Sequence, residues 1–172
     1  MHSKLDLCSM ALLKLGEPPI NSLSDNTPAS QLSRTLFDSI TDSMLALHPW
    51  NFATCEITLT KNSDGNFLVP ANVLRILKTN GQLCGNRIYS DSDKINITAV
   101  TRIDCTEYPC YFASLVTTRL AMEFCIPLCG DTSIFRTLAA LYESDLQSAK
   151  FTDSTSSVPQ GIRDFSLLDS RF

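Results

Sequence analysis

The first apolar residues of the chain recur at helical spacing. They are Leu5, Cys8, Leu12 and Leu15. Positions three or four apart lie on one face of an α-helix. Ser3 and Asp6 form a capping-box pattern at its start, and Gly16 is a favoured residue just after a helix end. Because Pro18 follows and cannot continue a helix, the pattern predicts a helix that ends near Gly16.

A second, longer stretch has the same period. Thr27 is a suitable N-cap and Pro28 suits the first helical position. The residue before a proline is disfavoured in the helical conformation, so this helix should end at His48, before Pro49. Its apolar stripe is Leu32, Leu36, Ile40, Met44 and Leu47.

The period changes to two between residues 54 and 103. Cys55, Ile57 and Leu59 alternate with polar residues, as in a half-buried strand. A turn at 62–65 precedes Phe67, and the simplest interpretation is a hairpin between 54–60 and 67–69. Further strands are predicted at 73–78, 82–89 and 95–100.

Helical spacing returns after residue 109. Pro109 is placed at the first position of a third helix, which Pro127 and Gly130 should terminate. Asp131 or Thr132 should cap a fourth helix. The two apolar stripes are Phe112, Leu115, Val116, Leu120 and Phe124, and then Ile134, Phe135, Leu138, Leu141, Tyr142 and Leu146.

These elements predict a mainly α fold with a small inserted antiparallel β region. The order is α-α-β-α-α, in which the two helix pairs meet as a bundle and the sheet projects from it. The core should span residues 1–150, with the β insertion at about 54–103.

The C-terminal residues 151–172 differ in kind. We expect a polar linker at 152–157, followed by an extended tail without helical period. Its candidate docking residues are Ile162, Arg163, Phe165, Leu167, Leu168 and Phe172. A segment too short for its own core, yet rich in large apolar groups, is typical of docking onto a partner. The alternative is that it folds back over the chain's own helices.

Composition narrows the function classes. The chain has 172 residues, of which 44% are hydrophobic and 19% charged, and its formal net charge is −4. This size suits one domain. The net negative charge and the dispersed Lys and Arg residues argue against nucleic-acid binding. We expect no secretory signal at the N-terminus and no apolar window long enough to span a membrane. Seven cysteines without metal-ligand spacing are predicted to be reduced and to bind no metal or other cofactor.

The sequence lacks a catalytic motif. The glycine-rich phosphate loops, HExxH and GxSxG are absent. Asp38 with Asp42, and Glu143 with Asp145, are close in sequence, and we interpret them as exposed helix-surface residues rather than as an acid/base pair. We therefore expect no enzymatic activity.

The segment 48–53 stands out because it contains the single tryptophan. Pro49 ends the long helix, and Trp50 and Phe52 can each bury a large surface where helix gives way to strand. A hydrophobic corner in the core is the favoured interpretation, and a direct partner contact the alternative. Gly16, Pro49, Trp50, Asn51 and Phe52 are the structural corner motif of the candidate site.

Taken in order, several short motifs resemble one known family. They are LLKLGEPPI at 12–20, PWNFA at 49–53, LVPANVLR at 68–75, and Arg119-Leu120-Ala121 with Glu123, Pro127 and Leu128. The series is similar to the head-to-tail adaptor, or connector, proteins of short-tailed bacteriophages, which include the P22-type tail accessory factor and the T7-type tail tubular protein A. The match spans residues 5 to 150. One departure is Asn72, where the family pattern has an acid.

The resemblance implies a structural protein of the virion, present in the host cytoplasm during assembly. It implies a ring of twelve copies under the portal protein that extends the DNA channel to the tail nozzle protein. Double-stranded DNA would pass through the lumen without specific binding, and no membrane is involved. Two alternatives remain: a phage-associated soluble enzyme such as a peptidoglycan hydrolase, and a cytoplasmic protein-interaction module.

Overall fold

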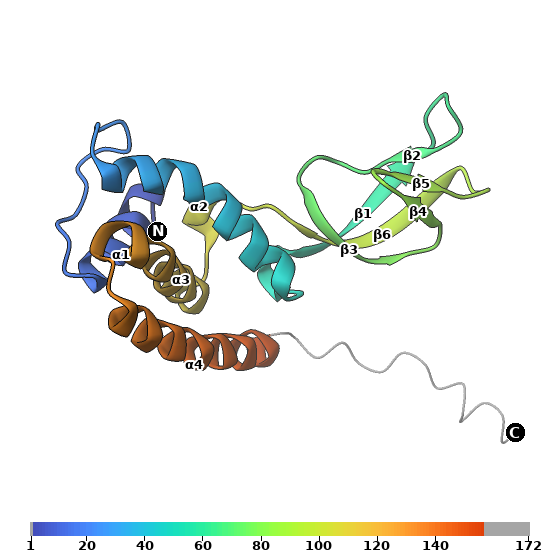
Figure 1. The fold of residues 1–172 in the computed structure, drawn as a ribbon. Coiled ribbons are helices and arrows are strands. Elements are labelled where there is room, and N and C mark those ends of the chain that lie inside the picture. The colour runs from blue at the N-terminus through green and yellow to red at the C-terminus, as the bar shows by residue number, and fades with distance from the viewer. Residues whose placement is uncertain (1, 157–172) are drawn as a thin grey trace, which may run out of the picture.

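The computed structural model describes residues 2–156, which form a helical part and a β part that projects from it (Figure 1). Within these residues there are four α-helices and two small antiparallel sheets. This mixed composition agrees with the expected helical domain with a β insertion. The predicted docking residues of the tail, 162–172, lie outside the described residues.

The first two helices begin and end where their sequence signals indicate. α1 spans Lys4–Lys14, and Ser3 and Asp6 form its capping box. α2 spans Pro28–Leu47, with the Thr27 side chain accepting a hydrogen bond from the backbone N–H of Ser30. His48 caps α2 in an extended conformation, as expected for a residue before proline.

The third helix, α3 (Cys110–Cys129), runs through Pro127 instead of ending there. A proline removes one backbone hydrogen-bond donor. Because Pro127 lies so close to the end of the helix, this loss leaves the last turn intact. The helix ends at Gly130, whose φ of 64° provides the left-handed cap. Pro109 was predicted at the first helical position but is the N-cap of α3, so the helix begins one residue later than predicted.

The fourth helix, α4 (Thr132–Ser156), is longer than predicted. The Asp131 carboxylate accepts hydrogen bonds from the backbone N–H groups of Ser133 and Ile134 and so caps its start. Residues 152–156 were expected to be polar linker, but they continue the helix past the expected boundary at 150. The reason is tertiary, because Asp153 is buried against the rest of the helical part.

α3 lies at the centre of the helical part and contacts α1, α2 and α4. This surrounded position explains why its apolar residues cover most of its circumference. Its fully buried side chains include Phe112, Val116, Leu120 and Phe124. The other three helices each present an apolar stripe to α3, and together they enclose one hydrophobic core.

The β part contains two three-stranded sheets. The first has the order β1 (Thr54–Thr60), β6 (Lys94–Thr101), β3 (Val73–Thr79). The second has the order β2 (Phe67–Leu68), β5 (Arg87–Tyr89), β4 (Gln82–Cys84). The predicted strand at 82–89 is thus two short strands joined by a turn at Gly85, whose φ is 58°.

The predicted hairpin between 54–60 and 67–69 is wrong. β1 pairs along its whole length with β6, so that Ile57 lies opposite Ile97 and Leu59 opposite Ile95. These cross-strand apolar pairs stabilise the ladder, and β2 pairs with β5 instead. The β part thereby gains a small hydrophobic cluster of its own, with Phe67 and Ile88 fully buried.

Two arginines connect the β part to α2. Arg102, directly after β6, donates from Nε to Asp42 Oδ1 over 2.7 Å and also pairs with the second carboxylate oxygen. Arg75 of β3 donates to the backbone oxygen of Ala46 over 3.2 Å. Both contacts lie at the C-terminal half of α2, where the two parts meet.

Candidate functional site: the Trp50 corner

The corner begins where Pro49 ends α2. The Trp50 N–H donates to the backbone oxygen of His48 over 2.8 Å, and a short 3₁₀ turn, η1 (Asn51–Ala53), leads into β1. The polypeptide therefore changes direction within a few residues. This turn is the junction between the helical part and the β part.

Trp50 fills the inside of the corner and is 0% exposed. Its indole N–H donates over 2.9 Å to the backbone oxygen of Met44, in the last turn of α2. The indole meets the Phe112 ring edge-on, with 5.1 Å between ring centroids. The structure therefore places Trp50 in the core, and its side chain is not available to a partner.

Asn51 and Asp153 join the corner to the last turn of α4. The Asn51 N–H donates to both carboxylate oxygens of Asp153, over 3.2 and 3.0 Å, and its side-chain amide donates to the Asp153 backbone oxygen over 2.6 Å. The Tyr111 hydroxyl donates to the same carboxylate over 2.7 Å. Asp153 is 1% exposed, so these donors replace the water that the carboxylate loses on folding.

Titratable groups at the corner respond to burial. Burial raises the pKa of Tyr111, and the hydrogen bond to Asp153 raises it further. Burial also lowers the pKa of His48, whose ring meets the Trp50 indole edge-on. Both shifts favour the neutral side chain, which suits a structural corner.

The Asp153 carboxylate is occupied by donors and is not placed to act as a general base. The role of this arrangement is structural, because it fixes the end of α4 to the base of the β part. Residues 157–172 follow α4 in the sequence. Sequence analysis missed Asp153, because a single acid in the polar run 152–157 carries no periodic signal. The signal that existed was Asn51, a polar residue between two aromatic ones.

The predicted corner residues do not all lie together. Pro49, Trp50, Asn51 and Phe52 meet near the start of α3, where Phe52 contacts the Phe112 ring. Gly16 lies at the end of α1, where its φ of 78° allows the chain to turn. The Glu17 N–H there donates to the Leu12 oxygen over 3.0 Å. Gly16 is thus a separate helix terminus.

Three of the four carboxylates considered for catalysis are engaged in ion pairs or hydrogen bonds, and the fourth, Glu143, is exposed. Asp38 accepts a hydrogen bond from Lys4 Nζ over 2.9 Å, and Asp42 pairs with Arg102. Asp145 accepts from the Thr118 hydroxyl over 3.0 Å. Asp38 and Asp42 line the same pocket of about 400 Å³, but each of them is paired there with a cation. A catalytic pair needs two carboxylates in different environments.

The seven cysteines all lie within the described residues and are free thiols. Among residues 2–156, no group of three or more His, Cys, Asp or Glu side chains is arranged to hold a metal ion.

α3 is long and apolar enough to cross a membrane, contrary to the expectation that no such window occurs. Its mean hydropathy over that window is 1.4, and 61% of the window is buried inside the protein. The central helix of a folded domain meets the same criteria, and α3 has that position here. One such helix is therefore weak evidence for membrane insertion.

Comparison with protein-family models gives no match, and no curated protein is found that is similar to this chain.

Proposed function

We propose that this protein is a structural head-to-tail adaptor of a bacteriophage virion. In this role, copies of the chain form a ring of twelve under the portal, extend the DNA channel and join it to the tail nozzle. The helical part, as a bundle, builds the wall of the ring, and the β part faces the nozzle or a neighbouring copy. The observation that carries the proposal is the Trp50 corner, which fixes the relative orientation of three parts of the molecule.

Those three parts are the helical part, the β part and the end of α4, after which the C-terminal segment begins. Asn51 belongs to the turn that leads into β1, and its partner Asp153 belongs to the last turn of α4. A connector must present separate surfaces at fixed relative angles, because a closed ring needs two different patches on each copy. The C-terminal segment starts from a fixed point at the end of α4, and the β part projects elsewhere. The two can therefore contact different partners.

The distribution of exposed apolar residues also supports the proposal. Large apolar side chains with at least two fifths of their surface exposed occur on both parts, and they are Leu13, Leu47, Ile126, Leu141 and Phe151 on the helices, and Leu68, Leu83 and Tyr89 on the strands. Dispersed exposed apolar residues are ordinary on a monomer. Their presence on both parts is compatible with more than one contact surface.

Charge is divided between the two parts. The helical part, residues 2–53 and 104–156, has six Lys and Arg against twelve Asp and Glu, whereas the β part, residues 54–103, has six against four. An acidic wall would let double-stranded DNA slide, since a basic lining gains affinity through counterion release. The division supports a ring whose helical part faces the channel.

The test is co-assembly with the portal protein encoded in the same genome. Size-exclusion chromatography with light scattering should give one complex that contains a full ring of this chain. Deletion of 158–172 should leave the core folded, with a cooperative unfolding transition, but weaken portal binding. A wild-type chain that stays separate from the portal over a range of salt concentrations would refute the proposal.

A further inference from the structure

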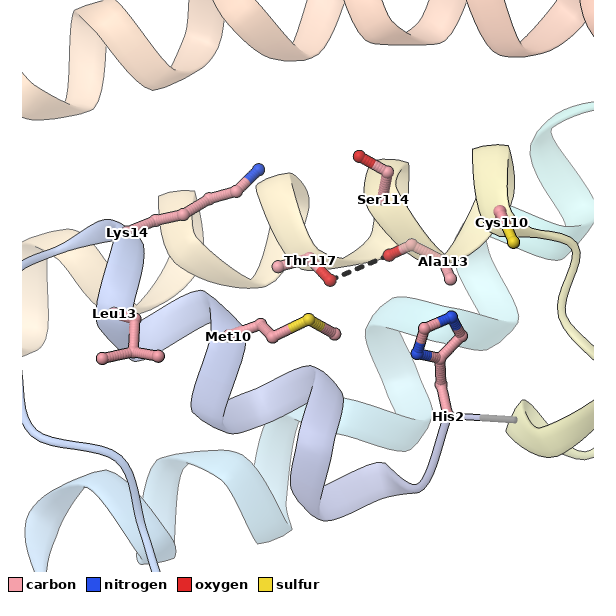
Figure 2. A pocket seen from close by; sticks show the side chains of 8 residues that line it. All are labelled: His2, Met10, Leu13, Lys14, Cys110, Ala113, Ser114 and Thr117. Carbon is pink, nitrogen blue, oxygen red and sulfur yellow. Dashed lines mark hydrogen bonds between the residues drawn. The ribbon is translucent and has the colours of Figure 1, made fainter.

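An open apolar groove of about 550 Å³ lies between α1 and α3 (Figure 2). Met10 and Leu13 line it from α1, and Cys110 and Ala113 line it from α3. Leu13 is 58% exposed, and the Cys110 thiol is exposed at the end where α3 begins. The groove therefore offers apolar surface that neither helix covers.

The groove wall contains the polar side chains of His2, Lys14, Ser114 and Thr117, and two of them, Lys14 and Thr117, are bound within the protein. The Thr117 hydroxyl donates to the backbone oxygen of Ala113 over 2.8 Å, as Figure 2 shows. Lys14 Nζ donates to the Thr118 hydroxyl over 2.7 Å, and that hydroxyl donates to Asp145. Small-molecule sites combine apolar walls with convergent polar groups that fix the ligand. Here Lys14 and Thr117 are already engaged, so an apolar segment suits the groove better than a polar small molecule.

The chain itself contains such a segment, directly after α4. Residues 158–172 carry large apolar side chains and equal numbers of acidic and basic ones, with Arg163 and Arg171 against Asp164 and Asp169. Its large apolar side chains are Val158, Ile162, Phe165, Leu167, Leu168 and Phe172. A segment with this composition gains free energy by burying those groups against an apolar surface.

The end of α4 lies close to the start of α3, which forms one end of the groove. α4 runs antiparallel to α3, since Thr118 contacts Asp145 and Tyr111 contacts Asp153. Tyr111 is the neighbour of Cys110, which lines the groove. From Cys110 to Thr117 the groove wall is about 11 Å long at the rise of an α-helix. Sixteen residues, 157–172, reach roughly 50 Å when extended, so the segment can enter the groove of its own chain.

We propose that residues 158–172 bind in the groove between α1 and α3 of the same chain. A tethered segment has an effective concentration in the millimolar range, which favours the chain's own segment over that of a second copy. This contact does not depend on the proposed adaptor role. If that role holds, the groove and the portal compete for one segment, and the segment leaves the groove on assembly.

The reactivity of the Cys110 thiol tests this proposal. Full-length protein and a 158–172 deletion are treated with a neutral alkylating reagent, and each cysteine is quantified by peptide mass spectrometry. Cys110 should react about tenfold faster in the deletion. Cys55 and Cys84, which are exposed on the β part, should react equally in both proteins and serve as internal controls. Equal Cys110 rates in the two proteins would overturn the proposal.

Point variants keep the test valid if the deletion perturbs folding. Leu13→Asp in the groove and the double change Phe165→Ser with Leu168→Ser in the segment should each raise Cys110 reactivity in the full-length chain. Leu47→Asp, at a similarly exposed position on α2, should not. Variants that leave the Cys110 rate at the full-length value would overturn the proposal.

Protein concentration distinguishes the occupant. Protection of Cys110 should be the same at low and high protein concentration, because the segment and the groove belong to one chain. Protection that appears only at high concentration would mean that a second copy supplies the segment, and it would overturn the same-chain proposal. Neither result depends on portal binding, so the adaptor proposal can fail while this one holds.

Discussion

The helical part and the β part of this protein are stabilised in different ways. The helical part has one continuous core around α3, with Trp50, Phe112 and Phe124 fully buried. The β part has a separate, smaller cluster in which Phe67, Ile88 and Ile97 are the largest fully buried side chains. Its strand β4 is exposed along its length. The helical part, with the larger core, is therefore the platform to which the β part is attached as a module.

The largest effect is expected from Trp50→Ala. Removing a fully buried aromatic side chain at the junction should lower the free energy of unfolding by about 4 kcal/mol, and it also leaves the Met44 carbonyl without its indole donor. Chemical denaturation followed by far-ultraviolet circular dichroism measures the change. Phe151→Ala is the matched control, because Phe151 is 71% exposed. A loss below about 1 kcal/mol at Trp50 would contradict its central place in the core.

Phe67→Ala should have the next largest effect, and it should be local. The expected cost is about 3 kcal/mol, confined to the β part because Phe67 packs in the separate cluster. Hydrogen exchange should show lost protection in β1, β5 and β6 while the amides of α3 keep theirs. Equal loss of protection in α3 would mean that the two parts unfold as one unit.

Tyr111→Phe should cost about 1–2 kcal/mol in the free energy of unfolding. The change removes one donor from the buried Asp153 carboxylate, and an incompletely satisfied buried charge is costly. Tyr89→Phe is the control, since Tyr89 is 46% exposed on the β part. If both variants unfold at the same denaturant concentration as wild type, the Asn51, Tyr111 and Asp153 network does not stabilise the corner.

Mildly alkaline pH should give the smallest effect and act on the helical part. Burial raises the pKa of the Cys8 thiol to about 11 and that of Tyr108 to about 12. A raised folded-state pKa means that stability is present below the unfolded value, 9.0 for the thiol, and is lost as pH rises through the folded value.

Between pH 8.5 and 9.5 the loss from Cys8 should stay below about 1 kcal/mol. Denaturation at both pH values checks this, with Cys8→Ala expected to show a smaller pH dependence than wild type. The exposed Cys84 gives the control, Cys84→Ala, which should keep the wild-type dependence. A wild-type chain that becomes more stable over this range would contradict the assignment.

Local signals predicted the helices well and the strand pairing poorly. Thr27, Pro28 and Gly130 act on their immediate neighbours, so their effects can be deduced from sequence. The partner of β1 is some forty residues away, and alternation in 54–60 identifies a strand without identifying β6 as its partner. Asp153 was missed for the same reason, because its donors Asn51 and Tyr111 are distant in sequence and meet it only in the folded molecule.

We propose that this chain joins a portal to a tail through a ring. Negative-stain electron microscopy of the purified protein mixed with the portal ring from the same genome tests it most directly. The proposed role predicts a second ring below the portal with a continuous axial channel. If the β parts face the nozzle and not a neighbouring copy, they should appear as small projections on the side away from the portal. Portal rings without added density at saturating protein concentration would contradict it.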